Sequence, residues 1–419
     1  MLNKENQREL CWVARINDVK PIPGKDRVEC AVVGGWTIMV RKDQFKPGDL
    51  GIYFEIDSKT PETEPFEFLA GKHYKIKTQG YRIPDGKFYS QGLLMSADDF
   101  GGMQYQDGDG TMYLHFGKDS YFKENKDYAE GDFLTEKLGV VYAVDDDNKR
   151  KAKTNPDAKI NAALARHPKI AKKYGKLIKK NKFLRNMFIL FFGKKRDNRS
   201  WIPGVPKTDE ERIENRPWTL DDQTKKWVAT EKIDGTSTTF YLKRGKGLTK
   251  SEYLVCSRNV VFDTPEKGKN NYYAEALGNV YLEMSEKYNM REVLDKLLRN
   301  RPTADWVAIQ AETFGAGIQK RDYGMKDHEI RAFNLRYSDC GRVGTLQMRD
   351  ELEPLGVPVV PIISDGMTLP STIENLRAFV HSAPSAIDCG MKEGIVFRTL
   401  DGADSFKCVD PEFLLKYHQ

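Results

Sequence analysis

Short runs of alternating apolar and polar positions fill the first hundred residues of the chain. They are rich in β-branched and aromatic residues, and turn-forming Pro-Gly pairs at 23–24 and 47–48 separate several of them. The runs cover residues 11–22, 28–40, 49–56 and 90–96. Short strands joined by tight turns favour a small β-barrel or sandwich over helices, and we predict an OB-like β-barrel domain for residues 1–145.

Strand-like runs return in the second half of the chain and alternate with helical periodicity. The expected strands are residues 227–233, 237–242, 252–257, 306–314, 329–336, 394–398 and 404–409. Helical stretches are expected around 271–299 and 371–381. Thr208 and Glu211 have the spacing of a capping box, so we predict a helix beginning at Thr208. Residues 206–419 therefore form a domain of the α+β or mixed α/β class.

A basic segment lies between these two parts. Its apolar positions have the spacing of one or two amphipathic helices interrupted at Pro168; they are Leu164, Ile170, Tyr174, Leu177, Ile178, Phe183 and Met187. Residues 149–199 hold 18 Lys and Arg against Asp157 and Asp197, a local charge of +16 in a chain of net charge +6. This excess suits a polyanion such as nucleic acid, and a solvated basic helix pair is an equally good explanation. We predict a basic helical insert over residues 146–205.

The sequence gives little support for a membrane-spanning segment or for disulfide bonds. The longest strongly apolar run, residues 187–192, is far shorter than the roughly 20 residues that cross a bilayer, and the first residues contain no apolar stretch. The six cysteines are far apart, without a C-x-x-C pair. We therefore expect an intracellular protein, cytoplasmic or nuclear, with reduced thiols, no membrane contact and no obligate protein partner.

Candidate chemistry centres on Lys232 in the hexapeptide at residues 230–235, between two expected strands. A deprotonated lysine attacks the α-phosphate of a nucleotide, and the carboxylate of Asp234 helps to hold a metal ion that neutralises the phosphate. Gly235 lets the backbone turn tightly beside a ligand. Taken alone, this tetrapeptide K-I-D-G also fits an ordinary surface turn.

Five further residues follow Lys232 at intervals along the chain. They are Arg258 within 257–259, Glu312 within 311–319, Phe333 within 331–336, Glu393 within 392–398 and Lys407 within 405–410. Each has a simple structural explanation, such as a core aromatic or a surface charge. Together, in this order and spacing, they resemble the successive motifs of the covalent nucleotidyltransferases, which are the polynucleotide ligases and RNA capping enzymes.

The resemblance implies a role for each residue. Lys232 forms the bond to AMP and Lys407 neutralises charge on the α-phosphate, and together with a metal ion Lys407 is expected to depress the pKa of Lys232. ATP-binding roles are implied for Glu231, Lys232, Arg258, Phe333, Glu393, Lys407 and Arg212. Asp234, Glu312 and Glu393 are implied as ligands of a hydrated Mg²⁺ or Mn²⁺.

The end of the chain indicates which branch of this superfamily the sequence resembles. Only twelve residues follow Lys407, which leaves no space for the second OB domain of DNA ligases and capping enzymes, so Arg212 is our candidate for orienting pyrophosphate. A barrel in front of the transferase domain resembles the RNA ligase branch with an N-terminal OB domain, as do residues 88–94, 205–215 and 405–417.

That branch implies an α+β fold with an ATP-grasp-like adenylyltransferase domain of antiparallel sheets and flanking helices. It also implies an ATP-dependent ligase that joins the 3′-OH and 5′-phosphate ends of RNA in a nicked duplex. The basic insert departs from the branch, and so does Val409, where many ligases have a lysine that Lys416 would replace. A ligase preferring DNA ends and a non-catalytic nucleic-acid-binding protein of the same fold are the alternatives.

Overall fold

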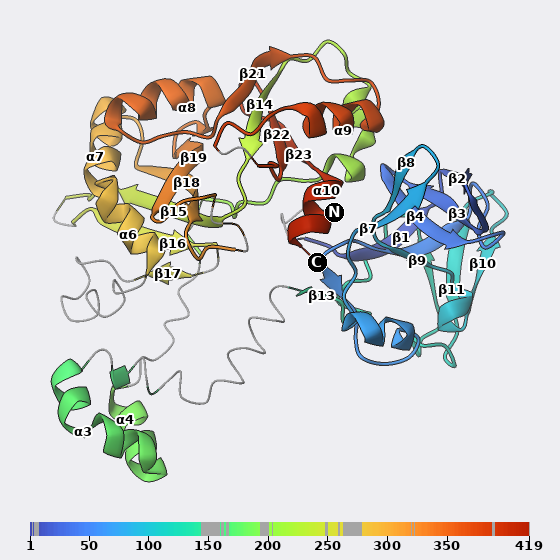
Figure 1. Cartoon of the computed structure of the whole chain (residues 1–419), viewed down its shortest axis with the longest axis horizontal. Coiled ribbons are helices and arrows are strands. Elements are labelled where there is room, and N and C mark those ends of the chain that lie inside the picture. The colour runs from blue at the N-terminus through green and yellow to red at the C-terminus, as the bar shows by residue number, and fades with distance from the viewer. Residues whose placement is uncertain are drawn as a thin grey trace.

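The computed structural model places two bodies of strands and helices side by side, with the helix pair α3 and α4 drawn apart from both (Figure 1). The residues that it describes are 1, 3, 8–143, 160, 163–164, 167–192, 201–202, 204–247, 250–258, 260–262, 279–319, 321, 323–387 and 390–418. Within these ranges no helix is long and apolar enough to span a bilayer. Five cysteines in these ranges are free thiols, and Cys389 lies outside them.

The N-terminal body is built from short antiparallel strands, as predicted. Its main strands are β1 (Cys11–Arg15), β2 (Asp18–Ile22), β3 (Lys25–Val33), β4 (Trp36–Arg41), β5 (Leu50–Phe54) and β9 (Leu93–Met95). They pair as β1-β5-β9 and as the meander β2-β3-β4. Alternation is clearest in β4, where every second side chain is buried. The smaller strands are β6 (Ser58–Lys59), β7 (Gln79–Ile83), β8 (Gly86–Ser90), β10 (Gly102–Gln106), β11 (Met112–Phe116), β12 (Lys126–Ala129) and β13 (Val141–Tyr142).

The C-terminal body contains two antiparallel sheets. One has the order β21-β14-β22-β23, from β14 (Trp227–Lys232), β21 (Ile362–Met367), β22 (Gly394–Thr399) and β23 (Ser405–Val409). The other has the order β17-β16-β15-β18-β19-β20, from β15 (Thr236–Lys243), β16 (Glu252–Ser257), β17 (Val261–Phe262), β18 (Trp306–Gly315), β19 (His328–Tyr337) and β20 (Gly341–Arg342). The predicted α+β class and antiparallel sheets are thereby confirmed.

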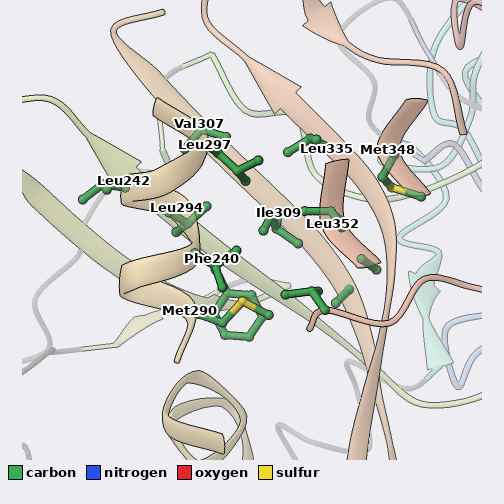
Figure 2. Packing of buried hydrophobic residues seen from close by; sticks show 14 of the residues in the cluster. Phe240, Leu242, Met290, Leu294, Leu297, Val307, Ile309, Leu335, Met348 and Leu352 are labelled. Carbon is green, nitrogen blue, oxygen red and sulfur yellow. The ribbon is translucent and has the colours of Figure 1, made fainter. Parts of the chain in front are cut away.

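Helices cover the larger sheet on one face. They are α6 (Val280–Lys287), α7 (Met290–Asn300) and α8 (Thr345–Leu352). Helix α7 buries residues at i, i+3, i+4, i+7 and i+8, which is the pattern of a one-sided apolar stripe. Figure 2 shows Met290, Leu294 and Leu297 of this helix packed beside Val307 and Ile309 of β18. The helical periodicity expected at 271–299 is thus confirmed for the part that the structure describes.

Two short helices border the smaller sheet, namely α9 (Ile373–Ser382), as expected, and α10 (Pro411–Tyr417), which was not predicted. The helix predicted at Thr208 was wrong. No helix includes residues 208–211, and a short 3₁₀ turn, η3 (Ile213–Asn215), follows instead. The reason is that the capping side chains have other partners: Thr208 shares a 2.8 Å hydrogen bond with Ser237, and the carboxylate of Glu211 accepts one from the side-chain amide of Asn215.

The basic segment contains the expected helices. Helix α3 (Pro168–Lys180) begins at the predicted proline, and α4 (Lys182–Phe192) follows after a single residue. The two helices pack through a small cluster that includes Ile178 and Phe188. Residues 144–159, 161–162, 165–166, 193–200 and 203 lie outside the described residues, and so does the predicted boundary at residue 145.

The N-terminal body, called the barrel below, shares a buried interface with the C-terminal body. Val409 and Leu414 belong to the same apolar cluster as Trp12, Trp36 and Tyr53 of the barrel. The indole N–H of Trp36 donates a 2.6 Å hydrogen bond to the side-chain oxygen of Asn215. On the rim, the ammonium of Lys87 lies 2.7 Å from the carboxylate of Glu412 on α10. The interface places the barrel directly beside the end of β23.

Candidate active site

Lys232 is the last residue of β14 and pairs with Gly394, the first residue of β22. A side chain at Gly394 would collide with the neighbouring strand, because a Cβ there would lie 2.3 Å from the carbonyl oxygen of Cys408. The close packing of β22 on β23 fixes the preceding residue, Glu393, at the strand end. The ammonium of Lys232 donates a 2.7 Å hydrogen bond to the carboxylate of Glu393.

Two more carboxyl groups act on Lys232 from the loop after β14 and from the larger sheet. Burial and the nearby charge of Glu393 raise the pKa of Asp234 to about 6. Burial, Glu393 and Asp234 raise the pKa of Glu312 to about 8, although Lys232 opposes this shift. Like charges brought together in a partly buried site have this effect when too few cations balance them.

The protonation of Lys232 depends on the balance between burial and the neighbouring carboxylates. Burial on its own lowers the pKa of the lysine, but the carboxylates of Glu393, Glu312 and Asp234 outweigh burial and leave the pKa above its ordinary value. The protein groups alone therefore hold Lys232 protonated, and its depression by a metal ion together with Lys407 stays a prediction. A cation among the carboxylates would reverse this balance.

The backbone after Lys232 lies against β18. A Cβ at Gly235 would come within 2.3 Å of the carbonyl oxygen of Thr313, so only glycine allows this approach. The hydroxyl of Tyr323 accepts a 2.7 Å hydrogen bond from the amide of Asp234, and the side chain of Gln319 donates one to the carbonyl of Gly235. Tyr323 and Gln319 hold the loop in place, and the sequence analysis did not identify these roles.

Lys407 and Arg258 meet on one carboxylate, Asp209. The ammonium of Lys407 and the guanidinium of Arg258 each lie 3.0 Å from its oxygens. Burial raises the pKa of Asp209, but Lys407, Arg8 and Arg258 outweigh it and hold that pKa well below its usual range. Burial lowers the pKa of Lys407 and nearby cations add to this, while Asp209 opposes it. The sequence analysis missed Asp209, although it lies in the stretch 205–215 that carried the family resemblance.

Arg212 lies beside Lys407, because the two residues form an isolated parallel β-bridge. Its guanidinium is buried at the interface and faces the barrel, 3.3 Å from Asp57 and 3.8 Å from Glu55. Arg212 thus links the barrel to the strand that carries Lys407.

Phe333 is the extra residue of a β-bulge. Gln310 pairs with Asn334 and the next residue, Ala311, pairs with Ala332, so Phe333 has no partner on β18. Such a bulge redirects a side chain. The Phe333 ring is partly buried and packs against a small apolar cluster that includes Ile233 and Tyr323. These two residues adjoin Asp234 in the loop after β14.

The carboxylate of Glu231 accepts hydrogen bonds from the loop after α9. One of its carboxylate oxygens accepts a 2.6 Å hydrogen bond from the hydroxyl of Ser385 and the other a 2.7 Å bond from the backbone amide of Ala386. Its side chain fixes the loop after α9 beside the nucleophile strand.

Val409, where a second lysine is common, is buried against the barrel, which explains the apolar residue there. Lys416 is on α10 with its ammonium 5.0 Å from the ring centre of Tyr417. Among the described residues, no group of three or more His, Cys, Asp or Glu side chains is already arranged to hold a metal ion. The carboxylates near Lys232 therefore do not form a complete protein-only metal site.

Comparison with known proteins agrees with this architecture. Residues 10–97 match the model of an OB-fold domain, and residues 225–418 match the model of the RNA ligase family. None of the curated proteins matches the chain.

Several solved structures of Naegleria gruberi RNA ligase share the fold. One solved with pyrophosphate is 23% identical with a TM-score of 0.66, and covers 98% of this chain and 99% of its own. A variant solved with ATP and Mn is 23% identical with a TM-score of 0.66, at 98% and 100% coverage. Another variant, solved with AMP and Mn, is 23% identical with a TM-score of 0.67, at 98% and 99% coverage. The chain therefore has an OB-fold match at residues 10–97 ahead of an RNA ligase match at residues 225–418, and as a whole it shares the fold of these RNA ligase structures.

Proposed function

We propose that this chain is an RNA ligase that uses ATP to activate RNA ends through a covalent lysyl-AMP intermediate on Lys232. The observation that carries the proposal is the surroundings of the Lys232 ammonium. At the end of β14 it lies 2.7 Å from Glu393, within the field of the carboxyls of Glu312 and Asp234. A lysine held among acids suits a nucleophile that loses its proton when cations enter the site.

The nucleotide is proposed to bind between Lys232 and the surrounding polar groups. Phe333 offers a ring face for adenine, and Arg258 is placed to hold the ribose or the 3′ side of the RNA break. Lys407 neutralises charge on the α-phosphate, and Arg212 orients pyrophosphate. The Naegleria structures that contain ATP, AMP or pyrophosphate support a nucleotide site in this fold. Glu231 contributes by shaping the wall of that site.

A divalent cation fits the acidic residues around Lys232. Asp234 and Glu312 have raised pKa values because burial and neighbouring acids leave their charges poorly balanced. Mg²⁺ keeps several water ligands and takes phosphate oxygens, so one or two of Asp234, Glu312 and Glu393 suffice to hold it. When bound, Mg²⁺ or Mn²⁺ neutralises phosphate charge and favours the deprotonated form of Lys232.

The reaction then has three steps. The Nζ of Lys232 attacks the α-phosphorus of ATP, which forms a P–N bond and releases pyrophosphate. A 5′-phosphate oxygen of the RNA next attacks this phosphorus, which transfers AMP to the RNA end and frees the lysine. Finally the 3′-OH attacks the 5′-phosphorus, which forms the phosphodiester and releases AMP. In each step the protein supplies position and charge neutralisation.

The polynucleotide is proposed to be RNA with 3′-OH and 5′-phosphate ends in a nicked duplex. We also propose three units, namely the barrel at 1–145, the basic insert at 146–205 and the adenylyltransferase domain at 206–419. The barrel lies beside β23, so RNA bound to it reaches Lys407 and Arg258. Contact between RNA and the barrel makes binding weaken with salt.

Sealing of nicked duplexes by the wild type and by Lys232→Ala tests the proposal. The wild type is expected to join 3′-OH/5′-phosphate RNA strands with ATP and to act more slowly on DNA strands. Lys232→Ala is expected to fail on these RNA strands yet to seal RNA that already carries AMP at its 5′ end, because only the first two steps need the lysine. Faster sealing of DNA favours the ligase that prefers DNA ends, and no sealing by either protein favours a nucleic-acid-binding protein.

A further inference from the structure

The helix pair α3 and α4 exposes an apolar face that the fold of the ligase does not use. On α4, Phe183, Met187, Leu190 and Phe191 are exposed and recur at i, i+4, i+7 and i+8, so they lie on one side of the helix. Phe183, Leu190 and Phe191 are 71%, 75% and 68% exposed. Single exposed apolar residues are ordinary, but a continuous set of large ones marks a contact surface.

Helix α3 also exposes apolar side chains. Its apolar stripe continues past the buried Ile178 to Tyr174 and Leu177, which are 46% and 56% exposed. Helix α4 therefore covers only part of the stripe. In Figure 1 the pair lies apart from the strands of both domains, and no sheet lies over it.

The same two helices carry positive charge and no acid. Exposed lysines lie along the outer side of α3 and at the start of α4, at Lys169, Lys172, Lys173, Lys176, Lys179, Lys180 and Lys182. Neither helix contains Asp or Glu. An apolar face beside a dense basic face is the pattern of helices that lie in the surface of an anionic membrane.

We propose that the exposed apolar side chains of α3 and α4, namely Tyr174, Leu177, Phe183, Met187, Leu190 and Phe191, dock onto an anionic lipid surface, with the lysines of α3 contacting the headgroups. Nucleic acid fits the lysines but not the aliphatic side chains. Leu177, Met187 and Leu190 have no ring to stack on a base, and phosphate contacts leave them in water. A lipid surface takes both faces at once. No membrane contact was expected from the sequence, because it offered neither a spanning segment nor an apolar stretch at its start.

Sedimentation of the full-length protein with vesicles tests this proposal. The wild type is expected to sediment with phosphatidylcholine vesicles containing phosphatidylserine, less in high salt, and not with phosphatidylcholine alone. The double variant Leu190→Ser with Phe191→Ser is expected to bind these vesicles on the order of a hundredfold more weakly, because two large side chains no longer enter the lipid. Phe68→Ser is the matched control, since Phe68 is 62% exposed on the barrel.

Two companion measurements separate the alternatives. Lysine adenylylation by the double variant is expected to equal that of the wild type, which shows that the ligase domain is intact. Binding of a single-stranded oligoribonucleotide is also expected to be unchanged. Absence of wild-type binding to the acidic vesicles overturns the proposal, as does equal loss in Phe68→Ser. Loss of oligonucleotide binding with vesicle binding intact assigns the face to RNA instead.

Discussion

Gly235→Ala is expected to disable the active site while leaving the fold in place. A Cβ at this position would lie 2.3 Å from the carbonyl oxygen of Thr313 and 3.0 Å from Cγ of Glu312, both on β18. The first of these atoms is backbone, so rotation of a side chain does not relieve the contact. The start of β15 must move away from β18 by roughly 1 Å to restore ordinary van der Waals spacing.

That displacement gives the magnitude of the effect. Overpacking of this kind costs about 1–3 kcal/mol of folding stability. The same shift separates Lys232 and Asp234 from Glu312, and a misplacement of about 1 Å costs on the order of a hundredfold in rate. The rate is measured in a single turnover as transfer of labelled AMP from ATP to the protein, and stability is measured by denaturant unfolding.

The control is Gly366→Ala on β21, because a Cβ there meets nothing within 4 Å. It is expected to retain the wild-type rate and stability. A Gly235→Ala protein that adenylylates as fast as Gly366→Ala would refute the claim that the close approach of the two strands holds the site together.

Three other substitutions probe separate parts of the account. Asp209→Asn removes a carboxylate that raises the pKa of Lys407, so the pKa of Lys407 falls further. The alkaline limb of the adenylylation–pH profile is then expected to move to lower pH. An unmoved limb means that the charge of Lys407 is not required. Trp36→Phe leaves the buried side-chain oxygen of Asn215 without its donor. It is expected to lower the free energy of unfolding, measured with denaturant, by about 1–3 kcal/mol. Unchanged stability contradicts a tight domain interface. Phe333→Leu is expected to raise the KM for ATP about tenfold with little change in kcat, and steady-state kinetics with an unchanged KM exclude its ring as the adenine platform.

The periodicity of apolar residues correctly predicted individual strands and helices. The run at 28–40 was correctly assigned to strands, and it folds as the hairpin of β3 and β4 around Gly34 and Gly35. The 3.6-residue stripe of α7 likewise predicted its buried face. The capping box at Thr208 failed because its side chain bonds to Ser237, a partner that no local pattern identifies.

The candidate site was predictable as a set of residues but not as a geometry. The order of Lys232, Glu312 and Glu393 along the chain carried the family resemblance, and the hydrogen bond between Lys232 and Glu393 joins two of these motifs. Asp209 was missed because its partner Lys407 is 198 residues away along the chain. The bulge at Phe333 likewise depends on the register between two long strands.

In the basic segment, too, the sequence predicted the helices but not how they pack. Its spacing predicted amphipathic helices, and α3 and α4 are present. Spacing alone does not tell which part of an apolar stripe is covered. Ile178 is buried in the helix pair, whereas Leu177, its neighbour in the sequence, is exposed. This difference gives the pair an unused apolar face.

The most direct test of the central claim is incubation of the purified wild type and of Lys232→Ala with α-labelled ATP and Mg²⁺, followed by denaturing separation. Label is expected to stay on the wild-type protein and to be absent from Lys232→Ala, because the phosphoramidate bond to Lys232 survives denaturation. Equal labelling of both proteins would contradict Lys232 as the nucleophile, and absence of label on the wild type would contradict the covalent mechanism.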